Sequence, residues 1–535
     1  MNLLRKTTSS KFFNLELFSF ILFVVVHVAL VNFNSAEWGD SYRILRASEF
    51  IRNGSYPSDE KRPPLFSAFL ALRPVSVDAV IWGRVVMLIF SILSFFVFYK
   101  LVKIYIKDEK YRFIALILFT FNPVYLYWSI RVMADVPFSF FVLLAFYISG
   151  RYSNKGYVKF ILLGFISGLA ILTRFEGYLL FASLMLSTFF SAADSEKQPE
   201  NRKSFISDLA QLFLKNWKSL LILGLTTFIT ITPWVLFRNP LRSSYFEETS
   251  RRTYDLKMIW TYFVSIFYSF GFTSAFYFIF SRFRTAARFL KENLDVTTFL
   301  GLELILILLW PAAIPRLFVC LIPFFIIILT LCMKGVFEEA QSVKKNRVDE
   351  VLVSGFFLLF YVVSQYFLKL QFLITNKKVF VVLVLLQVLA ILFFYLKKSV
   401  LLIITILIST VVWSLTIIFS HREIYTAIKL AGIYSRDNLS GKFLFNDTTS
   451  VADWYLNYSK PRINLEGEKA DFLNKEDLSY NDLLSKNVSY VITTNEDGVI
   501  FDRGIEKLEY LKLINSFRYN IGDKEFFANI FRFER

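Results

Sequence analysis

The feature that most constrains this chain is a series of long, almost uncharged apolar runs that recur from the N-terminus to about residue 420. A stretch of about 20 apolar residues is long enough to cross the hydrocarbon core of a bilayer as a helix. Hydrophobic residues make up 55% of the chain, above the share of about 45–50% that is usual in soluble globular proteins. The chain is therefore predicted to be a polytopic α-helical membrane protein.

The apolar runs predict about thirteen transmembrane helices. The first run, of about 20 residues, is longer than the hydrophobic part of a signal peptide, so we interpret it as a retained span. The predicted spans lie near residues 13–33, 80–105, 112–130, 136–150, 158–173, 177–193, 218–237, 257–280, 296–310, 317–333, 351–369, 379–396 and 399–420.

The positive charge of the chain predicts its orientation. The formal net charge is +17, and Lys and Arg lie mostly in short clusters between apolar runs. This pattern is typical of loops that contact cytoplasmic headgroups, so we expect the lipid bilayer, and no nucleic acid, as the partner of these charges. With the N-terminus in the cytoplasm, the basic loops fall on the cytoplasmic side. An odd number of spans then puts everything after about residue 421 outside the cytoplasm.

The pattern divides the chain into two parts. Residues 1–421 form the predicted transmembrane domain, with a long first external loop at 34–79. Residues 422–535 are predicted to form a small soluble α/β domain. Segments with strand character there include 441–447, 487–498 and 525–535, and segments with helical spacing are 449–458 and 504–513.

Cysteine and histidine are too few to support two common kinds of site. Both cysteines, Cys320 and Cys332, lie in one apolar run, which disfavours a disulfide framework or a thiolate metal site. The two histidines, His27 and His421, do not suffice for a histidine-rich metal centre. The chemistry must therefore rest on other side chains, and the charged residues of the external loops are the candidates.

Those charged residues occur in a recognisable order. An acidic residue, Asp40, follows the first span, and the first loop ends in "KRPPLFS" at 61–67. Further along come "FNPVYLYWSIRVMADVPFSF" at 121–140 and "GLAILTRFEGYLLF" at 168–181. In this order the pieces resemble the GT-C superfamily of integral-membrane glycosyltransferases. They are most similar to the protein O-mannosyltransferase-like group (glycosyltransferase family 39) and the lipid A aminoarabinose transferases.

The resemblance covers about residues 10–190 by motif and the remaining spans by architecture, and the soluble tail also looks like that of prokaryotic members. The family has an acidic residue after the first span, a Pro-Pro element at the end of the first outer loop, an acidic residue before the fourth span and an Arg or Lys turn near the fifth. One departure stands out: the first acidic position is often Asp-Glu, whereas Asp40 is followed by Ser41.

The resemblance implies a glycosyltransferase whose donor is a sugar on a polyprenyl-phosphate carrier. The acceptor would lie outside the cytoplasm and would be a protein, a lipid or a polysaccharide. Attack on the sugar, with inversion, needs a base near the acceptor nucleophile, and Asp40 is the candidate. The departing phosphate gains negative charge, which a guanidinium can stabilise. Arg174 is the first candidate for this contact, followed by Arg131 and Arg316.

The other candidates have alternative roles. Asp135 could orient the acceptor, pair with an arginine, or join Asp40 in binding a divalent cation such as Mg²⁺ or Mn²⁺. The remaining candidate substrate contacts are Glu176, Tyr42 and Arg62.

Structural roles compete with each of these assignments. Asp40 could cap a helix at about 41–52, and Asp135 could cap the span that follows it. Arg174 and Glu176 could simply pair with each other. Arg62 could shape its loop together with two prolines, and Arg316 could extend to the headgroups.

Two other functions compete with the enzyme hypothesis. A transporter or a flippase of lipid-linked sugars should show related halves with broken spans at matching positions. No such repeat is evident, and the ionisable residues gather at one predicted surface rather than along a pathway. An inactive relative acting as a scaffold remains an alternative, because the second acid after Asp40 is missing.

Overall fold

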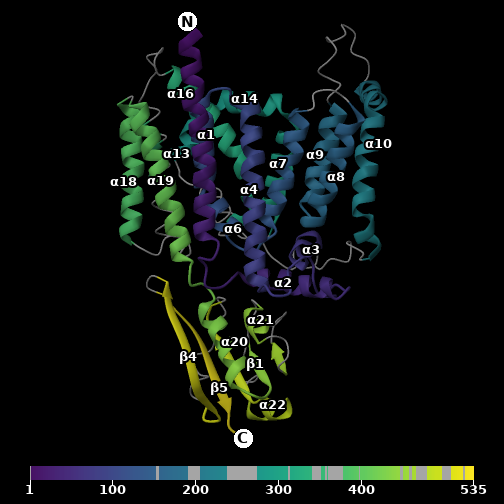
Figure 1. Cartoon of the computed structure of the whole chain (residues 1–535), viewed down its shortest axis with the longest axis vertical. Helices are drawn as coiled ribbons and strands as arrows, with labels where there is room; N and C mark the ends of the chain where they lie inside the picture. Colours follow the sequence, from purple (N-terminus) through teal and green to yellow (C-terminus); the bar gives the residue numbers. More distant parts are fainter. Residues whose placement is uncertain are drawn as a thin grey trace.

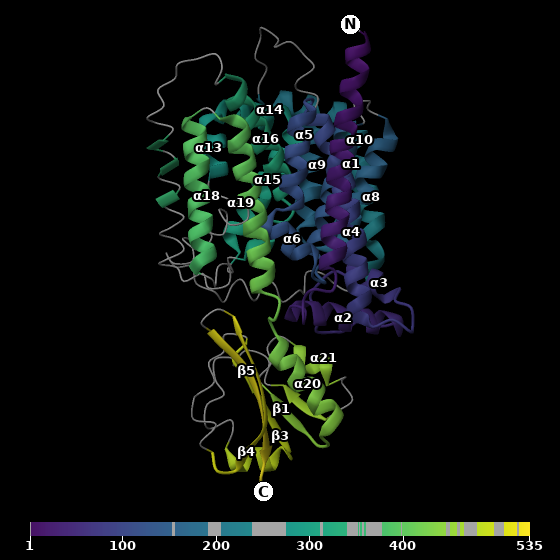
Figure 2. The ribbon, with the colours of Figure 1, turned by 60° about the vertical axis from the view of Figure 1, so that its left-hand side comes forward.

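In the computed structural model, the chain forms a helical bundle with a small α/β domain at one end (Figure 1). The N-terminus lies at the opposite end of the bundle, and the C-terminus lies at the far tip of the α/β domain (Figures 1 and 2). The structure describes residues 2–151, 156–190, 205–237, 274–310, 314–339, 351–352, 354–355, 358–359, 377–396, 398–445, 450–456, 461–464, 479–496, 508–521 and 524–535.

Most described helices of the bundle run along a common direction, while α2 and α3 lie beside the end that faces the α/β domain (Figure 2). The helices are α1 (Asn2–Leu30), α2 (Gly39–Arg52), α3 (Leu65–Ala71), α4 (Ala79–Tyr105), α5 (Glu109–Thr120), α6 (Pro123–Ser129), α7 (Asp135–Arg151), α8 (Tyr157–Thr173), α9 (Gly177–Phe190), α10 (Phe205–Phe237), α13 (Ser274–Ser281), α14 (Phe283–Glu292), α15 (Leu294–Leu309), the 3₁₀ helix η3 (Pro315–Phe318), α16 (Ile322–Glu339), α18 (Lys377–Tyr395) and α19 (Ser399–Ser420).

The bundle has the composition of a membrane domain. Among the described residues, three helices are long and apolar enough to cross a membrane, namely Ala79–Tyr105, Gln211–Phe237 and Ser399–Ser420. Several shorter helices of the bundle are also apolar. Large apolar side chains on the outer face of α4, such as Ile81 and Phe96, are half exposed. Exposed apolar side chains in such number are expected where lipid rather than water surrounds the bundle.

The prediction of one span over 112–130 is wrong, because the chain breaks there into α5 and α6. Asn122 caps α6, and its side chain accepts hydrogen bonds from the backbone N–H groups of Val124 (3.1 Å) and Tyr125 (2.9 Å). Pro123 has no N–H to continue the ladder of α5, and its fixed φ suits the first position of a new helix. The break places the short helix α6 directly before the loop that leads to Asp135.

Several other expected spans agree with described helices in position, including those near 80–105, 158–173 and 399–420. The apolar run expected at 317–333 begins instead as η3, and its regular helix, α16, starts at Ile322. The spans expected at 257–280 and 351–369 lie mostly outside the described residues. The total of about thirteen therefore stays a prediction.

Helices α8 and α10 approach closely at two glycines spaced by four residues. A Cβ at Gly164 would lie 2.6 Å from the carbonyl oxygen of Leu223, and one at Gly168 would lie 2.5 Å from Cβ of Thr230. This is the small-xxx-small spacing that lets helices pack tightly in membranes. Contacts of this kind stabilise a bundle that has no hydrophobic driving force between helices in lipid.

Gly168→Ala is therefore expected to destabilise the bundle. The added methyl group would overlap Thr230 of α10, and overpacking of this kind costs about 1–3 kcal/mol. Gly224→Ala on α10 is the matched control, because a Cβ there meets nothing within 4 Å, and alanine favours the helix. Thermal unfolding of the purified protein in detergent measures both changes. An equal loss of stability in the two variants would contradict this account of the packing.

The chain after α19 forms the small α/β domain. Its sheet has the strand order β2-β1-β3-β5-β4, with β1 parallel to both β2 and β3 and with β5 antiparallel to both β3 and β4. Helix α20 packs against the β4–β5 part of the sheet. The elements are α20 (Thr426–Asn438), β1 (Phe443–Phe445), α21 (Val451–Tyr455), β2 (Arg462–Asn464), α22 (Tyr480–Ser485), β3 (Tyr490–Thr494), β4 (Leu511–Ile521) and β5 (Lys524–Phe533).

The helix predicted over 504–513 is wrong at its described end, where strand β4 begins at Leu511. The segment from Leu511 to Ile521 alternates apolar and polar side chains over most of its length, which is the period of a strand. Pairing along β5, from Leu511 opposite Phe533 to Ile521 opposite Lys524, outweighs the helical spacing of the preceding residues. A pattern read in a short window misses this long hairpin.

The α/β domain is joined to the end of the bundle by polar contacts. The Ser35 hydroxyl donates to Glu423 at 2.6 Å, and the ammonium group of Lys429 donates to the carbonyl oxygen of Ser35 at 2.5 Å. Helix α2 also contacts α21, where the hydroxyl of Tyr42 donates to that of Tyr455 at 3.2 Å. The domain thus lies against the loop that carries Asp40.

Candidate active site

Asp40 lies in the first turn of α2 and does not cap it. The N-cap residue is Trp38, and it makes no side-chain capping bond. The prediction of a capping role is therefore wrong. The carboxylate of Asp40 instead accepts hydrogen bonds from two guanidinium groups, Arg62 Nη2 at 2.5 Å and Arg316 Nη1 at 2.8 Å. Its negative charge also lies near the positive end of the α2 dipole, which stabilises the ionised form.

The guanidinium group of Arg62 lies between two carboxylates of the first external loop. It pairs with Glu60, which is almost fully buried, at 2.9 Å, and also with Asp40. The two prolines that follow, Pro63 and Pro64, stiffen the chain, and α3 begins directly after them. Arg62 therefore has the expected loop-shaping position and also contacts the candidate base.

A buried ion pair fixes Asp40 relative to the loop before α7. Glu37 is fully buried, and its Oε1 accepts from Arg84 Nε at 2.7 Å. The other oxygen accepts from the backbone N–H of Val132 at 3.1 Å. Because Glu37 precedes Asp40 by three residues and Val132 precedes Asp135 by three, this one side chain ties the two acidic segments together.

Arg174 lies at the end of α8 and faces two carboxylates. Its Nη1 donates to Asp135 at 2.5 Å, and its Nε donates to Glu176 at 2.9 Å. Asp135 is the first residue of α7 and is almost fully buried. The expected pairing of Arg174 with Glu176 is thus present, and Asp135 is joined to it.

The turn that carries Arg174 requires a glycine at its end. Gly177 donates its N–H to the carbonyl oxygen of Arg174 at 3.0 Å, and α9 starts there. A Cβ at Gly177 would lie 2.3 Å from the backbone nitrogen of Ile171 in α8. Only glycine lets the backbone of the turn pass so close to α8. This turn directs the side chain of Arg174 toward α7.

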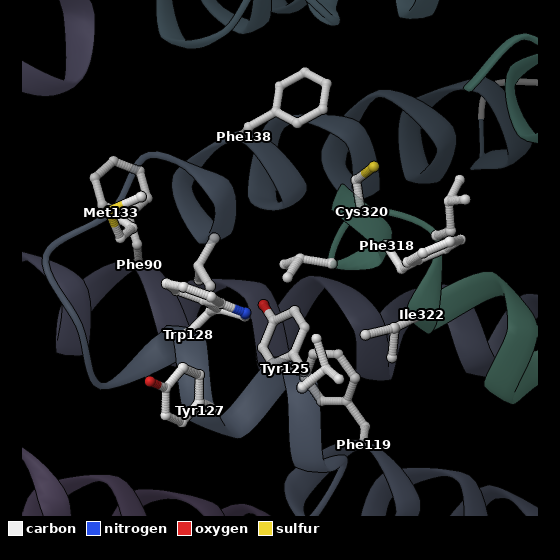
Figure 3. Close-up of a cluster of buried hydrophobic side chains, with 14 of the residues drawn as sticks. Phe90, Phe119, Tyr125, Tyr127, Trp128, Met133, Phe138, Phe318, Cys320 and Ile322 are labelled. Carbon is white, nitrogen blue, oxygen red and sulfur yellow. The ribbon is translucent and has the colours of Figure 1, made fainter. Parts of the chain in front are cut away.

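Arg316 connects the two groups of charges. It lies in η3, pairs with Asp40, and has its guanidinium carbon 5.9 Å from the centroid of the Trp128 ring. A buried hydrophobic cluster gathers side chains from α6, η3 and the start of α16, among them Trp128, Phe318 and Ile322 (Figure 3). Arg316 thus contacts the carboxylate of Asp40 and the Trp128 ring, and it also lines a small pocket.

A small, partly open pocket lies beside these charges, and its space of about 180 Å³ includes the solvent at its mouth. Several of its polar atoms are buried and have no hydrogen-bond partner in the described part of the chain, namely Asp135 Oδ2, Glu303 Oε2 and Arg316 Nε. Buried polar atoms are normally satisfied, so such a group points to a bound ligand or water. The pocket is lined by Asp135, Phe138, Arg174, Glu176, Glu303, Arg316, Leu317, Val319 and Cys320.

Two predicted contacts do not reach this pocket. Tyr42 is fully buried, with its hydroxyl accepting from the N–H of Glu37 at 3.0 Å and donating to Tyr455. Arg131 is also fully buried and donates to the carbonyl oxygens of Ala36 (3.3 Å) and His421 (2.9 Å). Both side chains brace the segments around the site rather than face its open space.

Two residues of the site have no role in the sequence analysis. Glu37 is hidden in a polar loop, where nothing in the sequence marks a buried carboxylate. Glu303 carried a usable signal, because it is the one charged residue in the apolar run at 296–310. An ionisable side chain inside a span is costly and is commonly functional.

The chain resembles known proteins in part of its sequence and in its fold. Residues 61–235, which include Arg62, Asp135 and Arg174, match the family model for dolichyl-phosphate-mannose-protein mannosyltransferase. The fold is similar to that of ArnT from Cupriavidus metallidurans bound to undecaprenyl phosphate, with a TM-score of 0.60 and 12% identity, covering 96% of this chain and 97% of that chain. The chain thus shares part of its sequence with this mannosyltransferase family and its fold with ArnT.

A second solved structure has the same fold. The archaeal oligosaccharyltransferase AglB from Archaeoglobus fulgidus, in complex with an inhibitory peptide and a dolichol phosphate, gives a TM-score of 0.53 at 11% identity and covers 96% of this chain and 74% of that chain. The curated proteins contain no match to the sequence. The chain thus has a bundle of mostly apolar helices of this fold, followed by a small C-terminal sheet domain.

The charges around Asp40 control its ionisation. Burial acts to raise the pKa of the Asp40 carboxyl, but the nearby charges of Arg62 and Arg316 outweigh burial and hold the pKa well below its ordinary value. The carboxylate is therefore ionised at neutral pH. While both arginines remain paired with it, however, it is a weak base.

The contribution of Asp40 to stability is expected to depend on pH. A carboxyl whose pKa is lowered by folding stabilises the folded state above its unfolded pKa, about 3.9, and this contribution is lost as pH falls toward the folded pKa. The difference in melting temperature between the parent protein and Asp40→Asn should stay constant from about pH 8 to 5 and shrink below about pH 4. A difference that grows on acidification would contradict the ion-pair assignment.

The alternative that Asp40 and Asp135 together bind Mg²⁺ or Mn²⁺ does not fit the site. Asp40 already accepts bonds from Arg62 and Arg316, and Asp135 accepts from Arg174. A cation between these carboxylates would lie beside fixed guanidinium charges, which repel it. In the described part of the chain, no group of three or more His, Cys, Asp or Glu residues is placed to bind a metal.

Proposed function

We propose that this protein transfers a sugar, with inversion, from a polyprenyl-phosphate carrier to an acceptor outside the cytoplasm. One observation carries the proposal: carboxylates and arginines from separate segments converge at one end of an apolar bundle. Asp40 comes from α2, Asp135 from α7, Arg174 from the α8–α9 turn and Arg316 from η3. A lipid-linked donor needs such a site, because its tail lies in the bilayer and its phosphate lies at the boundary.

Arg174 and Arg316 are the phosphate ligands in this proposal. Both line the pocket, and guanidinium groups bind phosphate through two parallel hydrogen bonds. Support comes from the two solved structures of the same fold, which hold undecaprenyl phosphate in one case and dolichol phosphate in the other. Arg62 serves mainly to hold Asp40, since it points to Asp40 and Glu60.

The reaction is a displacement at C1 of the sugar. The acceptor nucleophile forms a new bond to C1 on the face opposite the phosphate, and its proton passes to the Asp40 carboxylate. The bond between C1 and the phosphate oxygen breaks, and the phosphate leaves with the bonding electron pair. Arg174 and Arg316 stabilise the charge that develops on it.

Donor binding also prepares the base. In the structure described here, Arg316 is shared between Asp40 and the pocket. A phosphate in the pocket competes for this guanidinium and draws it away from Asp40. With one arginine fewer, the carboxylate becomes a stronger base at the moment when the sugar is in place. Asp135 and Glu176 keep Arg174 aimed at the phosphate.

The site and the α/β domain lie outside the cytoplasm in this proposal, with the N-terminus inside. The basic clusters of the loops support that orientation, and the structure has the N-terminus at the end opposite the α/β domain. In sealed membrane vesicles of known orientation, a C-terminal epitope tag should be cleaved by protease only from the extracytoplasmic face. Cleavage from the cytoplasmic face would contradict the topology.

The direct test of function uses purified protein in lipid nanodiscs. Labelled polyprenyl-phosphate hexoses are supplied with membrane extract as the source of acceptor, and transfer of label is followed. The proposal expects label on an acceptor and release of polyprenyl phosphate. In proteoliposomes, movement of the intact donor between leaflets without transfer would instead support a flippase, and the enzyme proposal would then be wrong.

A further inference from the structure

Glu303 is a buried carboxylate that the reaction described above does not use. It lies on α15, which otherwise presents apolar side chains along this stretch, and is only 2% exposed. One oxygen accepts a hydrogen bond from the thiol of Cys320 at 3.6 Å, and the other has no partner in the described part of the chain. A buried, unsatisfied carboxylate oxygen is costly unless a ligand supplies a donor.

The surroundings of Glu303 separate it from the other acids of the pocket. Asp135 and Glu176 are both paired with Arg174, and Asp40, which lies beside the pocket, is paired with Arg316. Within the described ranges, Glu303 forms no ion pair. The pocket therefore has one side built of arginines and another side formed by Glu303 next to the apolar groups of Phe138 and Leu317.

These two sides match the two parts of a sugar phosphate. The arginines suit the phosphate, whereas the carboxyl oxygens of Glu303 suit sugar hydroxyl groups, which can donate hydrogen bonds to them. Apolar side chains such as Phe138 suit the C–H faces of a sugar ring. In a site shielded from water, a hydrogen bond to a buried carboxyl group discriminates between ligands that have the hydroxyl group and ligands that lack it.

We infer that Glu303 is a specificity-determining residue that accepts hydrogen bonds from hydroxyl groups of the donor sugar. This inference rests on the proposed function, because it assigns the sugar side of the same pocket. The weak thiol donor of Cys320 holds one oxygen of Glu303 and leaves the other for the sugar. A purely structural role, in which Glu303 only packs in the bundle and bonds to Cys320, predicts no dependence on the sugar.

The test compares Glu303→Gln with the parent protein in nanodiscs, using two probes: polyprenyl phosphate without sugar, and a panel of polyprenyl-phosphate hexoses. Asp295→Asn is the matched control, since it lies on the same helix and bonds to Ser149 away from the pocket. Glu303→Gln should weaken binding of the sugar-bearing lipids by about 10- to 100-fold and leave binding of bare polyprenyl phosphate unchanged. Asp295→Asn should change neither.

Donors that lack single hydroxyl groups supply a second measurement, which needs only the parent protein if the variant does not fold. Removal of the hydroxyl that contacts Glu303 should weaken binding by about tenfold or more. In Glu303→Gln, the same removal should have little further effect. A panel in which no hydroxyl matters to the parent protein overturns the inference.

The remaining outcomes separate the two proposals. If the parent protein transfers sugar and Glu303→Gln binds every donor equally well, the inference is wrong and the proposed function stands. If Glu303→Gln loses bare polyprenyl phosphate and sugar-bearing lipids to the same extent, Glu303 acts on the phosphate side or on folding, which also overturns the inference. If the parent protein binds neither kind of lipid, the proposed function itself is wrong.

Discussion

Asp40→Asn is expected to lower the rate of sugar transfer by about 10²- to 10⁴-fold, the usual effect of losing a general base. The amide keeps the size of the side chain but cannot take the acceptor proton. It also frees Arg316 and Arg62, which both pair with Asp40. Binding of the donor should therefore be retained or become tighter. Single-turnover transfer of labelled sugar in nanodiscs, together with a separate binding assay, distinguishes the two steps.

Asp59→Asn is the control for this prediction. Asp59 belongs to the same external loop and pairs with an arginine, Arg46, but its side chain is 65% exposed and lies outside the pocket. Exposed pairs of this kind contribute little, so transfer should stay at the parent rate. If Asp40→Asn also retained the parent rate, Asp40 would not be the base.

Arg174→Ala is expected to lower affinity for the donor by about 30- to 4,000-fold. Removing one partner of a buried, hydrogen-bonded charge contact costs about 2–5 kcal/mol, and each 1.4 kcal/mol is about tenfold in affinity. Arg174→Lys keeps the positive charge but loses the planar fork, so it should fall between the parent and the alanine variant. Binding of labelled polyprenyl phosphate measures both variants.

Arg174→Ala also leaves Asp135 and Glu176 without their cation, so its folding must be checked. Unpaired buried charges destabilise proteins by about 3–5 kcal/mol, and a lower melting temperature is expected. Arg73→Ala is the control, because Arg73 also pairs with a carboxylate, Glu49 at 2.8 Å, but does not line the pocket. If the two alanine variants lost the same affinity, the phosphate contact of Arg174 would be excluded.

The sequence predicts those features of the fold that depend on a local pattern of apolar and polar residues. Uninterrupted apolar runs correctly indicate helices such as α4 and α19, because length and hydropathy suffice there. The prediction of a single span at 112–130 is wrong, because the N-cap Asn122 and Pro123 break the helix without a change in hydropathy. The helix predicted over 504–513 is wrong at strand β4, because a search for helical spacing in a short stretch does not detect the pairing of β4 with β5.

The site likewise contains residues that the sequence could predict and contacts that it could not. The charges at span ends, such as Asp135 and Arg174, were visible because they interrupt apolar sequence. The shared contact of Arg316 with Asp40 joins residues 276 positions apart, which no spacing predicts. Tyr42 lies in a polar loop like Asp40, yet it turns toward Tyr455 in the α/β domain. Which loop residue faces the pocket depends on tertiary packing.

A structure of the protein with polyprenyl phosphate in nanodiscs tests the central claim most directly. The claim is that charges from distant segments form one site for a lipid-linked phosphate. The account predicts phosphate density within hydrogen-bonding distance of Arg174 and Arg316, with Arg316 farther from Asp40 than the present 2.8 Å. Phosphate bound elsewhere on the bundle, with the contact between Arg316 and Asp40 unchanged, would contradict it.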